Sequence, residues 1–264
     1  MILDDLHYPI DILPKLARIA NDEMANTISH KDHFYGVGAI TLYDVGKAID
    51  ELDRCINDLG FVGVQIDSNI GGKPLDCPDF EPFYDRLTHW KAGLWIHPAY
   101  MRESYKWIDE YHLSSSVGWE FDESLAMIRL ARSGVLERHP DLKVITHHLG
   151  VIVPFFADRI SRSMMQDGKD GKPPKPLRKH PMDYLRMFYV DTAEGRWKPA
   201  LVCSEMFYGP RHMLFGTDFP FGPLTPSNWP RQIIRAVNEL EITSEEKEMI
   251  FGGNARKLFK LQVE

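Results

Sequence analysis

The sequence predicts an α/β fold in which buried parallel strands alternate with helices, and three observations support this. Short, nearly continuous apolar runs recur along the chain, as expected for parallel strands covered on both faces. Segments with helical periodicity separate these runs, which implies strand–helix–strand units. Four of the runs end in His or Asp, and the carboxyl ends of parallel strands are where such folds bind ligands. Right-handed units of this kind close naturally into a (β/α) barrel.

Six segments have the composition of strands, whereas a complete barrel of the TIM type has eight. We therefore predict an α/β, (β/α)8 TIM-barrel-like fold that is incomplete, with about six of its eight strand–helix units. We find no internal repeat and no linker, so residues 1–264 are predicted to form a single domain. The predicted strands are residues 34–42, 61–66, 92–97, 143–148, 186–191 and 212–218.

Four helices are predicted between and after these strands. Residues 44–59 place apolar side chains on one face, and Asp44 can cap the first turn. Residues 122–139 carry a broader apolar stripe. The sequence Thr243-Ser244-Glu245-Glu246 is a capping box, which opens a helix. Residues 252–254 then break the chain before a last short helix.

Two longer segments are predicted to be irregular. Residues 164–182 are rich in Gly, Pro and Lys, which is typical of a surface loop. Residues 98–121 are rich in Tyr and Trp and follow directly after a strand that ends in His97. An aromatic loop in that position is suited to form a pocket wall or a lid.

Composition and charge exclude several classes of protein. The net charge of −7 and the lack of a Lys/Arg cluster argue against binding to nucleic acid. Three cysteines, few and unevenly spaced, are typical of reduced thiols in a cytoplasmic protein. The sequence has neither an apolar stretch of the ~18 residues that a membrane span needs nor a signal-peptide pattern. We therefore expect a cytoplasmic protein with no membrane partner.

The polar residues at three strand ends are the chemically most informative feature. Asp218 ends one apolar run, His97 ends another, and the pair His147-His148 ends a third. Parallel strands bring these ends to one face of the sheet. Two imidazoles and a carboxylate are the groups with which proteins hold a catalytic divalent metal.

Short segments along nearly the whole chain also follow one another in the order found in one enzyme family. They include residues 61–66, Trp95-Ile96-His97-Pro98, residues 133–143, His148-Leu149-Gly150 with Pro154, residues 188–192, Gly216-Thr217-Asp218-Phe219-Pro220 and Gly252-Gly253-Asn254-Ala255. This order resembles the amidohydrolase superfamily, in its branch around aminocarboxymuconate-semialdehyde decarboxylase and γ-resorcylate decarboxylase. The segments are similar to the family's fourth to eighth strands and its C-terminal helix turn.

The resemblance implies roles for the strand-end residues. His97 would be the metal ligand of the fifth strand, and Asp218 the ligand of the eighth strand that also handles a proton. His148 would act as acid or base, because an imidazole changes its charge near neutral pH. The alternatives are a core histidine for His97 and a helix cap for Asp218. His147 is expected on the other face of its strand, in packing or behind the ligands.

Contacts with the substrate are expected from loops. Asn69, Arg102 and Trp119 are the candidates, and Arg102 would suit a carboxylate through paired hydrogen bonds. Surface loops often hold such residues without a function, so a solvated or packing role is the alternative. Asp191 also ends a strand, but an Asx-type turn explains it equally well.

One departure from the family concerns the metal. The family begins with a strand ending in His-x-His or Glu-x-His, and no such motif stands next to an apolar strand here. We therefore expect the first two strands to be missing, through truncation such as a late start codon or, alternatively, through degeneration. The family's Zn²⁺, or alternatively Mn²⁺, would then be bound weakly or not at all. Open sheet edges would favour a homo-oligomer such as a dimer.

Three hypotheses for the function follow. The leading one is a metal-dependent decarboxylase, a carbon–carbon lyase that acts on a small aromatic or muconate-like carboxylic acid. The second is a metal-dependent hydrolase of an ester, amide or lactone, because the ligand set is shared within the superfamily. The third is an inactive, metal-free barrel, because two ligands from this chain fall short of the three that catalytic zinc usually has.

Overall fold

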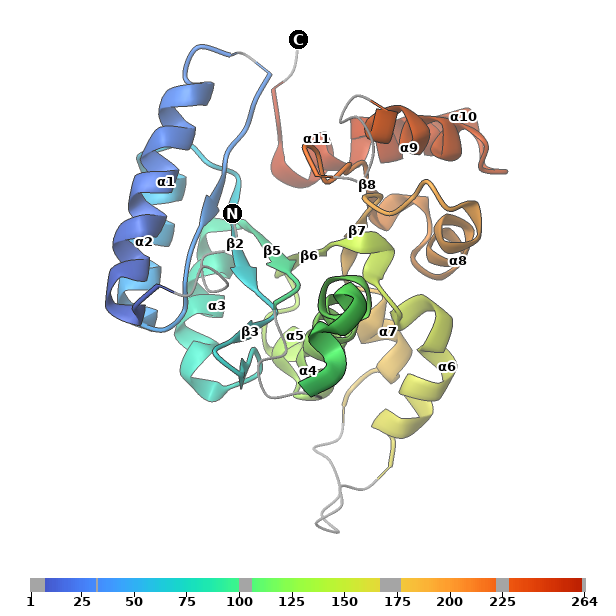
Figure 1. The fold of residues 1–264 in the computed structure, drawn as a ribbon, viewed down its shortest axis with the longest axis horizontal. Helices are drawn as coiled ribbons and strands as arrows, with labels where there is room; N and C mark the ends of the chain where they lie inside the picture. Colours follow the sequence, from blue (N-terminus) through green and yellow to red (C-terminus); the bar gives the residue numbers. More distant parts are fainter. Residues whose placement is uncertain (1–7, 32, 100–105, 167–176, 222–227, 263–264) are drawn as a thin grey trace.

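The computed structural model describes residues 8–31, 33–99, 106–166, 177–221 and 228–262 and has one main parallel sheet at its centre. Its strands follow one another in chain order (Figure 1). Each lies within a segment that the sequence predicts to be a strand, except that the second extends one residue beyond its predicted end. They are β1 (Val37–Ala39), β2 (Gly63–Asp67), β5 (Gly93–His97), β6 (Lys143–Thr146), β7 (Tyr189–Asp191) and β8 (Met213–Leu214), while β3 (Asn69–Ile70) and β4 (Lys73–Pro74) form a small antiparallel hairpin.

The sheet has six strands and is open in the part of the chain that the structure describes. Neighbouring strands are in parallel register, for example with Val64 opposite Leu94 and Leu94 opposite Val144. β1 pairs only with β2, and β8 pairs only with β7. The prediction of a partial barrel with about six strand–helix units is confirmed.

Helices flank the sheet along its whole length (Figure 1). The predicted helix 44–59 is present as α2, and the Asp44 side chain accepts a hydrogen bond from the Lys47 amide at 3.1 Å. The capping box of Thr243 and Glu246 is also present. The predicted helix 122–139 is two helices, because Gly134 adopts a φ of 82° between them. The α-helices are α1 (Leu13–Ile28), α2 (Val45–Asn57), α3 (Glu81–Trp90), α4 (Trp119–Arg132), α5 (Val135–Arg138), α6 (Val153–Met164), α7 (Pro181–Leu185), α8 (Lys198–Tyr208), α9 (Asn228–Asn238), α10 (Ser244–Glu248) and α11 (Asn254–Phe259).

The two segments predicted to be irregular are only partly described. The loop prediction for residues 164–182 falls largely on residues 167–176, which lie outside the described part. In the other segment, residues 100–105 lie outside it, and the residues that follow are helical turns at Lys106–His112 and Ser114–Gly118, directly before α4. The segment is irregular as predicted around the kink at Glu110 and Tyr111, but the prediction is wrong at its end, where α4 already begins at Trp119. None of the described helices combines the length and the apolar character required to cross a membrane.

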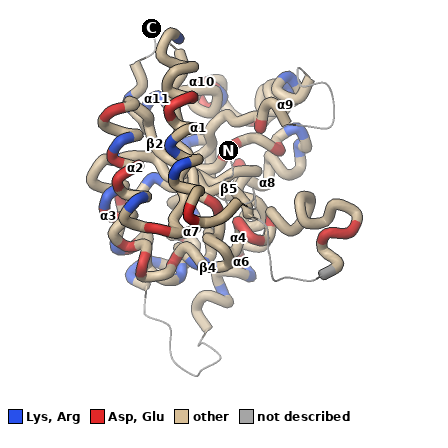
Figure 2. Tube along the Cα trace, turned by 60° about the vertical axis from the view of Figure 1, so that its left-hand side comes forward, with Lys and Arg blue, Asp and Glu red and all other residues tan. Residues whose placement is uncertain are grey.

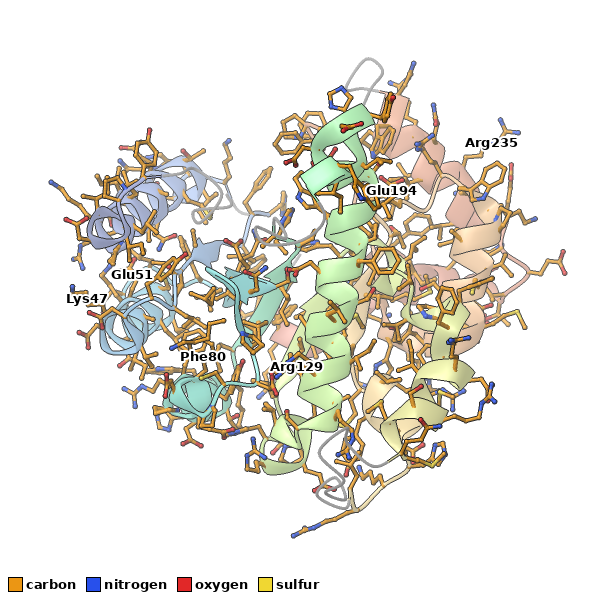
Figure 3. All side chains as sticks on the ribbon, turned by 60° about the horizontal axis from the view of Figure 1, so that its bottom comes forward. Lys47, Glu51, Phe80, Arg129, Glu194 and Arg235 are labelled. Carbon is orange, nitrogen blue, oxygen red and sulfur yellow. The ribbon has the colours of Figure 1, made fainter. Side chains whose placement is uncertain are left out.

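A side chain from α1 occupies the open edge of β1. The amide of Asn21 donates to the Ala39 carbonyl at 3.0 Å, and its oxygen accepts from the Ala39 amide at 2.7 Å. Asn21 and Ala39 are both buried. Asn21 also donates to Glu51 on α2 at 2.7 Å, and Figure 3 shows Glu51 on the side of α2 that faces α1. One asparagine thereby supplies the two hydrogen bonds that a neighbouring strand would make.

A second asparagine serves the edge at β8. The side-chain amide of Asn254, at the start of α11, donates to the carbonyls of Met213 at 2.7 Å and Pro210 at 2.8 Å. The Phe215 amide, just after β8, donates to the Ile250 carbonyl at 2.9 Å. Both edges therefore have partners within the chain. This weakens the argument that unpaired edges drive association, and the oligomeric state stays a prediction.

Acidic and basic residues are interspersed along the helices beside β1 and β2 (Figure 2). On α2, Arg54 pairs with Glu51 at 2.7 Å and with Asp22 of α1 at 2.6 Å. Arg86 of α3 binds both carboxylate oxygens of Asp53, at 2.5 and 2.6 Å. These pairs hold α1, α2 and α3 together on the outside of the sheet.

Replacing Asn21 tests the role of the edge contact. Asn21→Leu leaves the buried amide and carbonyl of Ala39 without partners, so we expect unfolding to become easier by about 2–4 kcal/mol. Urea denaturation measures the change. Asn26→Leu, which alters an exposed asparagine of the same helix, is the control. Equal losses in the two variants would contradict the proposed role.

Candidate active site

Three imidazoles gather at the carboxyl ends of β5 and β6. The ring centroid of His97 lies 5.3 Å from that of His147 and 6.4 Å from that of His148. The two adjacent histidine rings are 6.1 Å apart. The structure thus brings together the strand ends that the sequence predicts to meet.

His97 is the last residue of β5 and is partly buried. Its Nδ1 lies 2.7 Å from the Pro98 carbonyl, which can only accept a hydrogen bond. Nδ1 therefore carries the hydrogen, and Nε2 has a free electron pair. Burial, together with the neighbouring His147, lowers the pKa of His97 to about 3. His97 is thus a neutral imidazole with Nε2 available to a ligand.

The turn after β6 brings both following histidines into the site. β6 ends at Thr146, so the alternation of faces along a strand stops before His147. Residues 148–151 all have positive φ, between 50° and 74°. Such a backbone costs ~1–3 kcal/mol per residue outside glycine and is found mainly at functional sites. The expectation that His147 lies on the opposite face is wrong, because its ring is the nearer of the two to His97.

Asp191, the last residue of β7, holds this turn in place. One of its oxygens accepts from His147 Nδ1 at 2.6 Å. The other accepts from the amides of His148 and Ala193, both at 3.0 Å. Burial acts to raise the pKa of Asp191, but the charges and hydrogen bonds of His147 and His148 outweigh it and lower that pKa. The Asx-type turn predicted for Asp191 is present, and the same carboxylate also orients His147.

His148 is held as a cation. Its Nδ1 lies 2.9 Å from Oε1 of Glu120, at ion-pair distance although the angle is poor for a hydrogen bond. Burial disfavours the charged ring, but Glu120, Glu123 and Asp191 outweigh burial and raise the pKa of His148 to about 10. A protonated imidazole at neutral pH can donate a proton.

Asp218 lies beyond β8 in a left-handed conformation, with a φ of 55°. The residue as a whole is exposed, and partial burial of its carboxyl group raises its pKa. His148 and His147 act in the opposite direction, and Asp191 adds to the increase. The charges of the histidine cluster therefore affect the pKa of Asp218. No described residue donates a hydrogen bond to the Asp218 side chain.

Three acidic residues at the site were not predicted from the sequence. Glu120 and Glu123 lie in the first turns of α4. Glu194 follows β7; burial raises its pKa, while the charge of His148 acts to lower it and that of Asp218 to raise it. Figure 3 shows Glu194 beside α4. The sequence held one signal for Glu120, its position directly after Trp119. The helix that follows the long loop after β5 begins near the carboxyl ends of the strands, so acidic residues in its first turns lie near the site.

The three predicted substrate residues have different settings. The ring of Trp119 lies 6.1 Å from that of His97, edge to face, so it is part of the site. The amide of Asn69 donates to Asp122 at 2.8 Å, and its oxygen accepts from the Gly72 amide at 2.7 Å. These two hydrogen bonds of Asn69 stabilise the β3–β4 turn. A substrate contact for Asn69 stays a prediction. Arg102 lies outside the described residues.

The donor atoms fit a divalent metal in kind. Like His97, His147 carries its hydrogen on Nδ1, which faces the Asp191 carboxylate. The Nε2 atom of His147 is buried and has no hydrogen-bond partner in the described structure. A carboxylate behind a histidine is the usual support for a metal ligand. Within residues 8–262, less the gaps, no three His, Cys, Asp or Glu side chains converge as a ready metal site. The fit is therefore one of ligand type and not of a complete coordination sphere.

Comparison with known proteins agrees with this arrangement. The model of the amidohydrolase family matches residues 9–261, and the chain belongs to that family. The 2-amino-3-carboxymuconate-6-semialdehyde decarboxylase of Dictyostelium discoideum is 32% identical over 254 residues, which cover 93% of this chain and 67% of that protein. A γ-resorcylate decarboxylase of Rhizobium sp. is 30% identical over 260 residues, covering 94% of this chain and 76% of the relative. The resemblance inferred from the sequence is confirmed.

Solved structures extend the comparison to the fold. The 5-carboxyvanillate decarboxylase of Sphingomonas paucimobilis superposes with a TM-score of 0.84 at 28% identity, over 94% of this chain and 73% of the other. The enzyme of the same name from Novosphingobium aromaticivorans, in complex with manganese and 4-hydroxy-3-methoxy-5-nitrobenzoic acid, superposes with a TM-score of 0.86 at 26% identity, over 98% of this chain and 73% of the other. The partial barrel is therefore a portion of the family's TIM barrel.

Glu123 yields a test of the electrostatics. It is fully buried, and burial raises its pKa well above the ordinary value of 4.5. A raised pKa stabilises the folded state fully below pH 4.5 and progressively less as the pH rises. Glu123→Gln cannot ionise, so we expect its stability relative to the original protein to increase above that pH, by up to about 1.4 kcal/mol per pH unit.

Urea denaturation between pH 4 and pH 8 measures this difference. The exposed substitution Glu241→Gln removes one carboxylate elsewhere and is the control. A difference in stability that does not change with pH would show that Glu123 is ionised in the folded protein.

Proposed function

We propose that this protein is a metal-dependent decarboxylase of a small aromatic or muconate-like carboxylic acid. The observation that carries the proposal is the pair formed by His148, held protonated among carboxylates, and Asp218, whose pKa is raised beside it. His148 is a proton donor, and Asp218 is a carboxyl group with an increased affinity for protons; both lie at the carboxyl ends of the strands, where enzymes with this fold react. The relatives named as decarboxylases of aminocarboxymuconate semialdehyde and γ-resorcylate support the class of substrate.

The reaction needs a proton where carbon dioxide leaves. When the bond between the carboxylate and the substrate carbon breaks, its electron pair stays on that carbon. His148 or Asp218 delivers a proton there, and the aromatic face of Trp119 packs against the planar substrate. Asp191 keeps the turn of residues 147–151 in place, so that the imidazoles do not reorient during the reaction.

A divalent metal completes the proposal. His97 and Asp218 would hold it, and His147 is a third donor that its Nδ1 contact with Asp191 orients correctly. A bound ion would supply positive charge next to the substrate oxygens. Manganese in related structures favours Mn²⁺ over the Zn²⁺ expected from the sequence. Because three ligands do not converge in the described residues, we propose weak binding by this chain.

The decisive assay measures carbon dioxide. The purified chain is incubated with Mn²⁺ and with γ-resorcylate, 5-carboxyvanillate or aminocarboxymuconate semialdehyde, and we expect release of CO₂ from at least one of them. His148→Gln and Asp218→Asn should each lower kcat by about 10²–10⁴-fold through loss of proton transfer. His30→Gln, at an exposed position in the turn after α1, is the matched control.

Other products would overturn the proposal. Acid formed from an ester or lactone without CO₂ would identify the hydrolase alternative, and no turnover with any substrate or metal would identify an inactive barrel.

Metal binding is tested separately from activity. Calorimetric titration of the chelator-treated chain with Mn²⁺ should give one weak site, and His97→Ala should weaken it by about 10–100-fold. His89→Ala alters a histidine in the last turn of α3, before the amino end of β5 and away from the carboxyl ends of the strands. This variant should bind Mn²⁺ like the original chain. Equal affinities for all three proteins would exclude His97 as a ligand.

A further inference from the structure

A second charged cavity lies at the amino ends of the strands, opposite the candidate active site. It has a volume of about 690 Å³ and is bounded by the start of β6, the start of β7, the turn before β8, and α11. Figure 1 shows α11 next to β8. Five of its lining residues are Lys or Arg, and none of those described is Asp or Glu: the cations are Lys91, Lys143, Arg211, Lys257 and Lys260. In a chain with a net charge of −7, this concentration of one sign is unusual.

Part of this charge has an ordinary structural reason. Lys91 and Lys260 are the C-terminal caps of α3 and α11, where a positive charge stabilises the helix dipole. Lys143 donates to the carbonyls of Lys91 and Leu258, both at 2.7 Å, near those two helix ends. These contacts explain why three lysines meet at this place.

The contacts do not explain how the charges are balanced. None of the five cations lies within ion-pair distance of a carboxylate among the described residues, although eleven other pairs of Lys or Arg with Asp or Glu occur in them. Lys143 is partly buried, and its burial, together with the charges of Lys260 and Lys91, lowers its pKa. The side chains of Arg211 and Lys257 make no hydrogen bond or ion pair within the described residues, and both are exposed to a ligand.

The walls of the cavity are aromatic as well as basic. The rings of Tyr189 and His212 stack at 4.6 Å, and the His212 Nδ1 is fixed by the Phe188 carbonyl at 3.0 Å. The Lys143 ammonium also lies 5.5 Å from the centre of the Phe259 ring, next to the cavity lining formed by Leu258 and Lys260. Aromatic contacts and a fixed imidazole therefore accompany the cations in the walls.

We propose that this basic cavity binds a small polyanion, a molecule that carries two or more phosphate or carboxylate groups. One singly charged ion cannot reach five cations spread around a cavity of about 690 Å³. A polyanion can, and each group it places against Arg211 or a lysine makes a charge-assisted hydrogen bond. The site lies at the opposite end of the strands from the histidines, so it is separate from the proposed reaction.

Binding is measured by calorimetry at constant ionic strength, with no divalent ion added. The full chain is titrated with tripolyphosphate and, in a second series, with citrate. We expect saturable binding of at least one of them, and the difference between the two series identifies phosphate or carboxylate as the preferred group. The double variant Arg211→Ala/Lys257→Ala should bind at least about tenfold more weakly, since two contacts of the charged groups are lost.

The control is the double variant Lys15→Ala/Lys198→Ala, which loses the same two charges at exposed positions on α1 and α8. It should bind like the original chain. All three proteins should melt at similar temperatures without ligand, because the four replaced residues are exposed. Absence of saturable binding, or an equal loss of affinity in both double variants, would overturn the proposal.

Discussion

The whole sheet depends on how its two open edges are satisfied. A parallel sheet that does not close leaves backbone amides and carbonyls along its first and last strands, and burying them without partners is costly. Here two asparagines solve the problem from opposite sides: Asn21 of α1 binds Ala39 of β1, and Asn254 of α11 binds Met213 of β8. Each contact also attaches a helix to the sheet. Six strands can therefore form an ordered layer without the ring closure of a complete barrel, and the strand ends keep the positions that the chemistry requires.

Within that layer, one carboxylate organises the candidate site. Asp191 joins the end of β7 to the turn after β6, and through His147 and the His148 amide it fixes the strained backbone of residues 148–151. The histidines then differ in charge because their surroundings differ. His97 faces a carbonyl and other imidazoles and is neutral, whereas His148 faces carboxylates and is protonated. One cluster thus contains both a potential metal ligand and a proton donor.

Much of this arrangement could be predicted from the sequence, and the failures have physical causes. The apolar runs located all six strands of the main sheet, and Asp44 and Thr243 located two helix starts, because these signals are local. The prediction that parallel strands bring their carboxyl ends together correctly placed His97 near His148. Strand periodicity misplaced His147, since β6 ends one residue earlier and a run of positive φ follows. The partners of Asn21 and the carboxylates of α4 depend on contacts between distant segments, which no local pattern records.

The two ends of the strands also differ in electrical character. At the carboxyl ends, the carboxylates of Asp191 and Glu120 lie beside the His148 cation, while the amino ends of β6 and β7 face five cations around α11. This difference in charge between the two ends contributes an electric dipole moment along the strand direction. A protein with such a moment turns in the field of a charged surface, so that one pole adsorbs to a cationic support and the other to an anionic one at the same pH. The orientation of the molecule on any charged matrix, and hence which mouth of the barrel faces the solution, can be chosen by the sign of that matrix.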